Sequence, residues 1–155
     1  MLELHSRKKI NHKVPFRVPD AFYFVTICAA ERGVSTLTEN ATAILEAARH
    51  RQALGSWFLS LFLIMPDHLH MLVHVPPEQS LMRILADFKR YLSTVHHIAF
   101  QRDFFETRIR DAAHYAEKWS YIVYNPVVRG LVSVPREWPH VIAFSRQTGA
   151  ELPHR

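Results

Sequence analysis

The chain has 155 residues, of which 48% are hydrophobic and 12% aromatic, a composition typical of one folded domain with a substantial core. No apolar run reaches the roughly 18 residues that a membrane-spanning helix needs, and the basic start of the chain lacks the apolar segment of a signal peptide. A single cysteine, Cys28, excludes an internal disulfide, so we expect a cytoplasmic protein. The net charge of +5 favours a polyanionic partner.

Basic residues crowd the beginning of the chain. Its first seventeen residues contain one acid, Glu3, and the bases Arg7, Lys8, Lys9, Lys13 and Arg17. Basic arms of this kind commonly lie on phosphate groups. We therefore divide the chain into a basic arm over residues 1–21, one domain over residues 22–145 and a tail over residues 146–155. The candidate DNA contacts of the arm are Arg7, Lys8, Lys9 and Lys13.

The first half of the domain is predicted to contain three strands and one helix. Aromatic and β-branched residues indicate a strand over Phe22–Cys28, after which Thr38 is expected to cap a helix that Gly55 ends. Two very apolar strands should follow at Trp57–Ile64 and His68–Val75. The sequence Pro66-Asp67 supplies the turn between them.

The second half is predicted to contain two helices and one strand. Ser80 caps a helix with apolar residues at spacings of three and four, and a strand follows over Phe104–Arg110. Asp111 caps a further helix, expected to end near Asn125 because Pro126 disfavours helical geometry in the residue before it. This order of elements predicts an α+β fold of the ferredoxin-like, split β-α-β type. Its antiparallel sheet would carry two helices on one face, together with an added C-terminal helix.

Two histidines open the strand predicted at His68–Val75. His68 and His70 are separated by one residue, so they point to the same face of a strand whose side chains alternate. Two imidazoles on a rigid strand are a candidate metal clamp. The chain has eleven histidines, however, and the pair taken alone is explained more simply as structural or incidental.

Two polar residues on the last predicted helix strengthen the case for a metal site. Tyr121 and Asn125 are four residues apart and therefore share one helix face. An amide oxygen suits a third ligand position beside two imidazoles, and the tyrosine would hold its hydroxyl nearby. Ordinary roles are the alternative, namely a packing tyrosine and a turn asparagine before Pro126. With the histidines, the pair predicts a site where a phenolic oxygen attacks a phosphodiester.

Other basic residues are candidate contacts for the same polyanion. They occupy the polar face of the predicted helix after Ser80 and alternate positions late in the following strand. The simpler alternative for each is a solvated surface. The candidates are Arg83, Lys89, Arg90, Arg108 and Arg110.

Four segments resemble the single-tyrosine transposases with a His-hydrophobic-His motif, and within them the REP-associated tyrosine transposases. The segments are Phe22–Thr26, Met65–His70, Phe104–Arg110 and Tyr121–Val132. The resemblance implies that His68 and His70 bind a divalent metal, Mg²⁺ or Mn²⁺, and that Tyr121 is the nucleophile. Insertion-sequence members have glutamine four residues after the tyrosine, whereas this chain has Asn125, as the REP-associated branch does.

The same resemblance implies a reaction. The substrate would be single-stranded DNA that forms a hairpin, cut through a 5′-phosphotyrosine intermediate that leaves a free 3′-hydroxyl. A second 3′-hydroxyl could reverse the step and join strands without ATP. The protein would act as a monomer or homodimer, and no membrane partner is expected. Phe105 and Thr107 stand where the family has tryptophan and histidine, so the positioning of DNA is expected to differ there.

Two other functions stay open from the sequence. The chain could be a hairpin-DNA-binding protein of the same fold that does not cut. The two histidines could instead belong to a small-molecule metalloenzyme or a structural zinc site. A closed zinc site needs about four protein ligands, and one cysteine cannot supply the usual thiolates.

Overall fold

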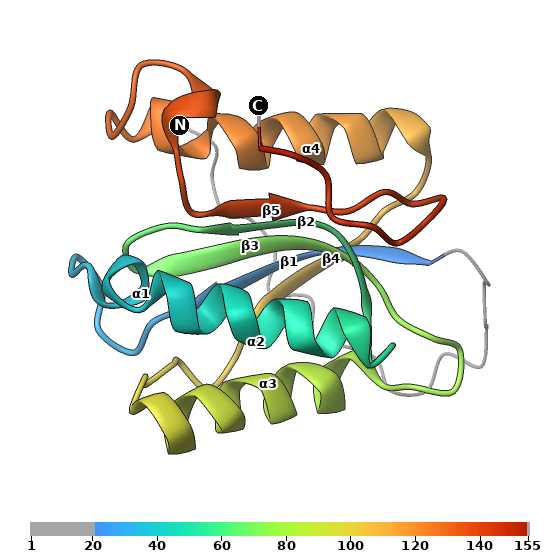
Figure 1. Ribbon diagram of the computed structural model, residues 1–155, viewed down its shortest axis with the longest axis horizontal. Helices are drawn as coiled ribbons and strands as arrows, with labels where there is room; N and C mark the ends of the chain where they lie inside the picture. The colour runs from blue at the N-terminus through green and yellow to red at the C-terminus, as the bar shows by residue number, and fades with distance from the viewer. Residues whose placement is uncertain (1–20, 155) are drawn as a thin grey trace.

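The computed structural model describes residues 21–154. Its elements follow one another as shown in Figure 1: β1 (Phe22–Cys28), α1 (Thr36–Glu39), α2 (Ala41–Ala53), β2 (Phe58–Ile64), β3 (His68–His74), α3 (Leu81–His96), β4 (Phe105–Arg108), α4 (Ala112–Val128), the 3-10 helix η1 (Pro135–Glu137) and β5 (Val141–Ala143).

The strands form a five-stranded sheet in the order β4-β1-β3-β2-β5, and every neighbouring pair is antiparallel. Helices α2 and α3 cover one face of this sheet, whereas α4 lies across the other (Figure 1). The predicted α+β fold, with an antiparallel sheet, two helices on one face and an added C-terminal helix, is confirmed. The histidine strand β3 lies between β1 and β2, so backbone hydrogen bonds hold it on both sides.

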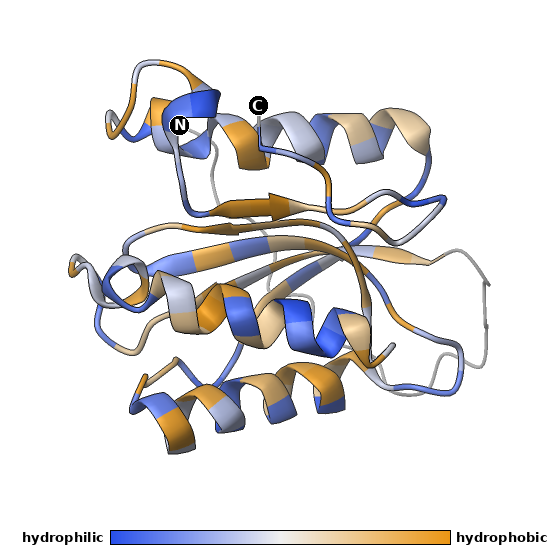
Figure 2. Cartoon of the chain, in the orientation of Figure 1, coloured by the Kyte–Doolittle hydropathy of each residue, from blue (hydrophilic) through white to orange (hydrophobic). Residues whose placement is uncertain are grey.

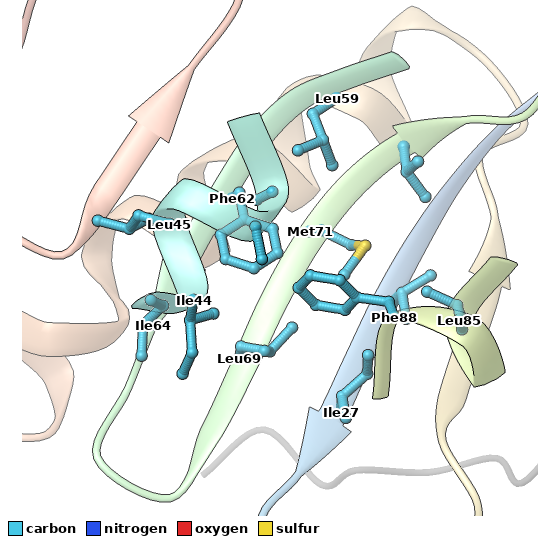
Figure 3. Packing of buried hydrophobic residues seen from close by; sticks show 14 of the residues in the cluster. Ile27, Ile44, Leu45, Leu59, Phe62, Ile64, Leu69, Met71, Leu85 and Phe88 are labelled. Atoms are coloured by element: carbon cyan, nitrogen blue, oxygen red, sulfur yellow. The ribbon is translucent and has the colours of Figure 1, made fainter. Parts of the chain in front are cut away.

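Apolar side chains are buried on both faces of the sheet, which explains why β2 and β3 are hydrophobic along most of their length. On β3, Leu69 and Met71 enter the larger core beneath α2 and α3, where Figure 3 shows them near Ile44 and Phe88. Leu72 enters the second core, beneath α4. Side chains therefore alternate between two buried layers, and His68 and His70, which face α4, are buried too.

The helices differ from the sequence prediction at both ends of the domain. Thr38 does not cap a helix, because it lies within α1, and Asn40 separates that short helix from α2. Helix α4 does not end near Asn125 but continues through Pro126 to Val128. Proline lacks an N–H donor and its ring crowds the preceding turn, but burial of Asn125 and Pro126 against the sheet stabilises the extra turn.

Two strands also differ from the prediction. The fourth strand is shorter than expected, since only Phe105–Arg108 pairs with β1. The region beyond α4 contains a strand that the prediction missed, β5, which pairs with β2. Figure 2 shows β5 as hydrophobic, and its residue Ile142 is buried. Trp138 fixes this region by donating a hydrogen bond from Nε1 to the carbonyl oxygen of Ile64 at 3.0 Å.

Among residues 21–154, no helix is both long and apolar enough to cross a membrane.

Candidate metal and tyrosine site

Strand β3 places His68 and His70 together on the sheet face that α4 covers. Their ring centroids are 4.8 Å apart, and their side chains are buried, with exposed fractions of 5% and 1%. The antiparallel register of β1 sets Thr26 opposite His70 and Cys28 opposite His68. The alternation of side chains along β3 thus brings two imidazoles to one point.

His70 is oriented by Thr26. Its Nδ1 lies 2.8 Å from the hydroxyl oxygen of Thr26, which is itself buried. With the proton on Nδ1, the imidazole donates to this hydroxyl and keeps the lone pair of Nε2 for a ligand on the α4 side. Burial lowers the pKa of His70 well below its ordinary value, and neighbouring positive charges reinforce the effect. The ring is therefore neutral near pH 7, as a metal ligand must be.

His68 is oriented by the aspartate that precedes it. Its Nδ1 lies 2.8 Å from Oδ1 of Asp67, whose other oxygen accepts a hydrogen bond from the N–H of Gly33 and pairs with Arg32. Burial raises the pKa of Asp67, but these three partners outweigh burial and hold it below its ordinary value. Burial lowers the pKa of His68, and the carboxylate only partly offsets this. A carboxylate behind an imidazole is a common second layer of metal sites.

Helix α4 brings Tyr121 and Asn125 to the histidines. The ring of Tyr121 lies 5.5 Å from the ring of His70 and 5.7 Å from that of Phe24. Nδ2 of Asn125 lies 3.5 Å from Nε2 of His70, the ring atom left free by Thr26. The structure therefore gathers all the residues that the sequence placed in a metal-plus-tyrosine site.

The donor set fits a divalent ion. Oδ1 of Asn125 is buried and has no hydrogen-bond partner among the described residues. A half-turn of the amide exchanges the positions of its oxygen and nitrogen. Oδ1 then lies beside Nε2 of His70, where both atoms can bind the same ion. An orphaned amide oxygen beside two neutral imidazoles is a ligand set that suits Mn²⁺, and Mg²⁺ when further oxygen ligands join.

A closed structural zinc site does not fit the described part of the chain. Within residues 21–154, no group of three or more His, Cys, Asp or Glu residues is placed to hold a metal. A metal held by His68 and His70 would therefore keep positions for water or substrate, as catalytic metal sites do.

Sequence analysis missed several residues around this site. Thr26 could have been found only from the register of β1 and β3, whereas Asp67 adjoins His68 in the sequence and was assigned only to the turn. Lys118 lies within α4, and Arg129 lies at the C-terminal end of this helix. The positive charge of each lowers the pKa of His70. Lys118 is three residues before Tyr121, and Arg129 is four residues after Asn125. These spacings are the sequence signal that places all four residues on the same helix face.

A cavity of about 630 Å³ adjoins the site. The loop from Gly33 to Thr36, the turn with Asp67 and His68, and Arg129 line it. Its lining is mixed, because Arg129 faces the carboxylates of Glu39 and Asp67 beside the candidate metal position.

The predicted DNA contacts are spread over the chain. Arg7, Lys8, Lys9 and Lys13 lie outside the described residues. Arg108 on β4 and Arg110 before α4 are exposed.

Three of these candidates, Arg83, Lys89 and Arg90, lie on α3, across the sheet from α4 (Figure 1). Nζ of Lys89 donates to the carbonyl oxygens of Gln101 and Arg102, and Arg90 pairs with Asp87 at 3.4 Å. Contact of α3 with DNA stays a prediction, and any DNA on α3 would lie across the sheet from Tyr121.

The structure has an antiparallel sheet with paired histidines on its central strand and a tyrosine on the helix that covers them. The model of the family described as "Transposase IS200 like" matches residues 21–120, more than half of the chain. The chain therefore belongs to the IS200-like transposase family, as predicted, and membership implies an enzyme that cleaves DNA. The match includes both histidines and stops one residue before Tyr121.

Two individual proteins are similar to this chain over most of its length. A protein of Haemophilus influenzae, provisionally named a REP-associated tyrosine transposase, is 29% identical over 147 residues, which cover 84% of this chain and 83% of the relative. A solved structure of a REP-associated tyrosine transposase bound to a REP hairpin superimposes with a TM-score of 0.73 at 21% identity. That alignment covers 81% of this chain and 78% of the other, and it confirms the fold.

Proposed function

We propose that this protein cuts and rejoins single-stranded DNA beside hairpins, using Tyr121 as the nucleophile and a divalent metal held by His68, His70 and Asn125. The observation that carries the proposal is the convergence of these side chains from β3 and α4. Family membership supports DNA cleavage, and the REP hairpin bound by the similar structure supports the choice of substrate.

The chain's own groups suit the proposed step. The oxygen of Tyr121 would attack the phosphorus, forming an O–P bond as the bond from phosphorus to the 3′-oxygen breaks. The phenolic proton passes to water, and the departing 3′-oxygen takes a proton from water. A divalent ion, when bound, polarises the scissile phosphate and neutralises developing charge. The products are a 5′-phosphotyrosine and a free 3′-hydroxyl, which can recombine because the phosphodiester energy is conserved.

The surroundings of the site suit a polyanion. The positive groups Arg32 and Arg129 lie near the two neutral histidines, and Asp67, the acid beside them, is already paired with Arg32. The adjoining cavity, lined in part by Arg129, gives room for nucleotides on one side of the scissile phosphate. DNA bound there would gain affinity from phosphate contacts that do not depend on sequence.

The test is a cleavage assay on labelled single-stranded hairpins with unpaired arms in the presence of Mn²⁺. The parent should cut beside the hairpin and form a covalent adduct that survives denaturation. Replacing both His68 and His70 by alanine should abolish cutting while hairpin affinity changes little. His50→Ala is a matched control, because His50 is exposed on α2, across the sheet (Figure 1).

The outcomes separate the competing functions. Equal cutting in EDTA would exclude a metal-dependent reaction. Hairpin binding with no cutting at any metal concentration would identify a DNA-binding protein that has lost its activity. Metal binding without any affinity for hairpin DNA would favour a small-molecule metalloenzyme.

A further inference from the structure

One cation on α4 lies directly over the ring of the proposed nucleophile. Lys118 precedes Tyr121 by three residues, so the two share a helix face. Its Nζ is 5.8 Å from the ring centroid of Tyr121 and 5.1 Å from that of Phe24. The ammonium thus lies beside the rings of both Tyr121 and Phe24, and Phe24 stacks on His70.

This ammonium has no acidic partner in the described part of the chain. The ion pairs within residues 21–154 use Arg32, Arg49, Arg90 and His68 as their basic members, and Lys118 is in none of them. The residue is also partly buried. A cation that is partly buried and has no carboxylate partner among the described residues is in a favourable position to receive an anion.

We propose that Lys118 is a further catalytic residue, which binds a non-bridging oxygen of the phosphate that Tyr121 attacks. This inference rests on the proposed function. Negative charge on the phosphate oxygens must be stabilised as the O–P bond forms, and a preorganised cation in a partly dry site is effective for that purpose. Lys118 keeps its proton throughout. The same contact would persist in the 5′-phosphotyrosine, where the phosphate is attached to the ring that Lys118 covers.

The alternative is that Lys118 only packs its stem and charge over two aromatic rings. Lys118→Met separates the two roles, because methionine keeps the length and apolar packing of the side chain and removes the ammonium. Lys118→Arg keeps the charge. Arg51→Met is a matched control, since Arg51 also lies over two rings, those of Phe88 and Tyr91 in the layer of α2 and α3.

The experiment measures the single-turnover rate of adduct formation at saturating hairpin DNA and Mn²⁺. We expect Lys118→Met to slow this rate by roughly 100-fold, with the melting temperature and the hairpin affinity, measured in a Tyr121→Phe background, nearly unchanged. Lys118→Arg should recover most of the rate, and Arg51→Met should match the parent. A methylphosphonate at the cleavage site, which removes the charged oxygen, should shrink the difference between Lys118→Met and the parent.

Two results would overturn the inference about Lys118 while leaving the proposed function intact. One is a Lys118→Met rate within twofold of an active parent. The other is a slow Lys118→Met rate that persists unchanged with the methylphosphonate, which would assign the lysine a structural role. A parent that forms no adduct with any hairpin and metal would overturn both proposals.

Discussion

Replacing Thr26 by valine should weaken metal binding without altering any proposed ligand. Valine has nearly the same shape as threonine, so β1 and its pairing with β3 should be preserved. The change removes the hydroxyl that lies 2.8 Å from Nδ1 of His70. Both residues are exposed by only 1%, so water cannot replace the lost partner.

The magnitude follows from this burial. Leaving one buried polar group unpaired costs about 1–3 kcal/mol, so the metal-free variant should be less stable by that amount. Loss of a second-layer partner typically weakens metal binding by roughly 10–100-fold, because the tautomer and ring orientation are no longer fixed. The Mn²⁺ concentration for half-maximal cleavage should rise by that factor, whereas the rate at saturating Mn²⁺ should stay within a few-fold of the parent.

The assay is a Mn²⁺ titration of hairpin cleavage, paired with urea unfolding of the metal-free protein. Thr26→Ser restores a hydroxyl and should recover most of the metal affinity. Thr42→Val on α2 controls for the same chemical change at an exposed position across the sheet from the site. Our account of the site would be refuted if Thr26→Val lost stability as expected yet kept the parent's Mn²⁺ dependence, because His70 would then need no orientation by Thr26.

Three further predictions concern the metal, the basic arm and pH. Asn125→Ala should raise the Mn²⁺ requirement for cleavage while changing the stability of the metal-free protein by less than about 1 kcal/mol, because Oδ1 has no partner among the described residues; parental activity at every Mn²⁺ concentration would leave Asn125 a purely structural residue. Deleting residues 1–20, which include most of the basic arm, should flatten the dependence of log affinity for hairpin DNA on log salt, and an unchanged slope would show that these residues do not touch DNA. Two imidazoles with an ordinary pKa of about 6.5 would lose about threefold in metal affinity between pH 7.5 and 6.5 as they protonate. Because burial lowers the pKa of His68 and His70, both stay neutral to lower pH, so calorimetry should show a smaller loss over this interval.

The central part of the site could be predicted because it depends on local periodicity. Alternation along a strand puts His68 and His70 on one face whatever the strand packs against, and a spacing of four puts Tyr121 and Asn125 on one face of a helix. The sequence also showed that the strands at β2 and β3 are very apolar, which their burial between two cores explains. These inferences needed no knowledge of distant contacts.

Other features depend on contacts between distant segments, and the sequence did not reveal them. The partner of His70 is Thr26, 44 residues away, and only the register of β1 and β3 brings them together. Strand β5 has three residues, too few for a periodic signal, and forms because the edge of β2 is available. Pro126 predicted a helix end by a local rule, yet packing against the sheet carries α4 to Val128.

Identification of the tyrosine that becomes bonded to DNA tests the central claim most directly. The protein should be incubated with hairpin DNA and Mn²⁺, denatured and digested, and the modified peptide sequenced by mass spectrometry. We predict a 5′-phosphate on Tyr121, no adduct from Tyr121→Phe, and a normal adduct from Tyr124→Phe, because Tyr124 is 52% exposed and lies about 100° around the helix from Asn125. A DNA phosphate on Tyr124, Tyr115 or any other tyrosine would contradict the assignment of this face of α4 as the active site.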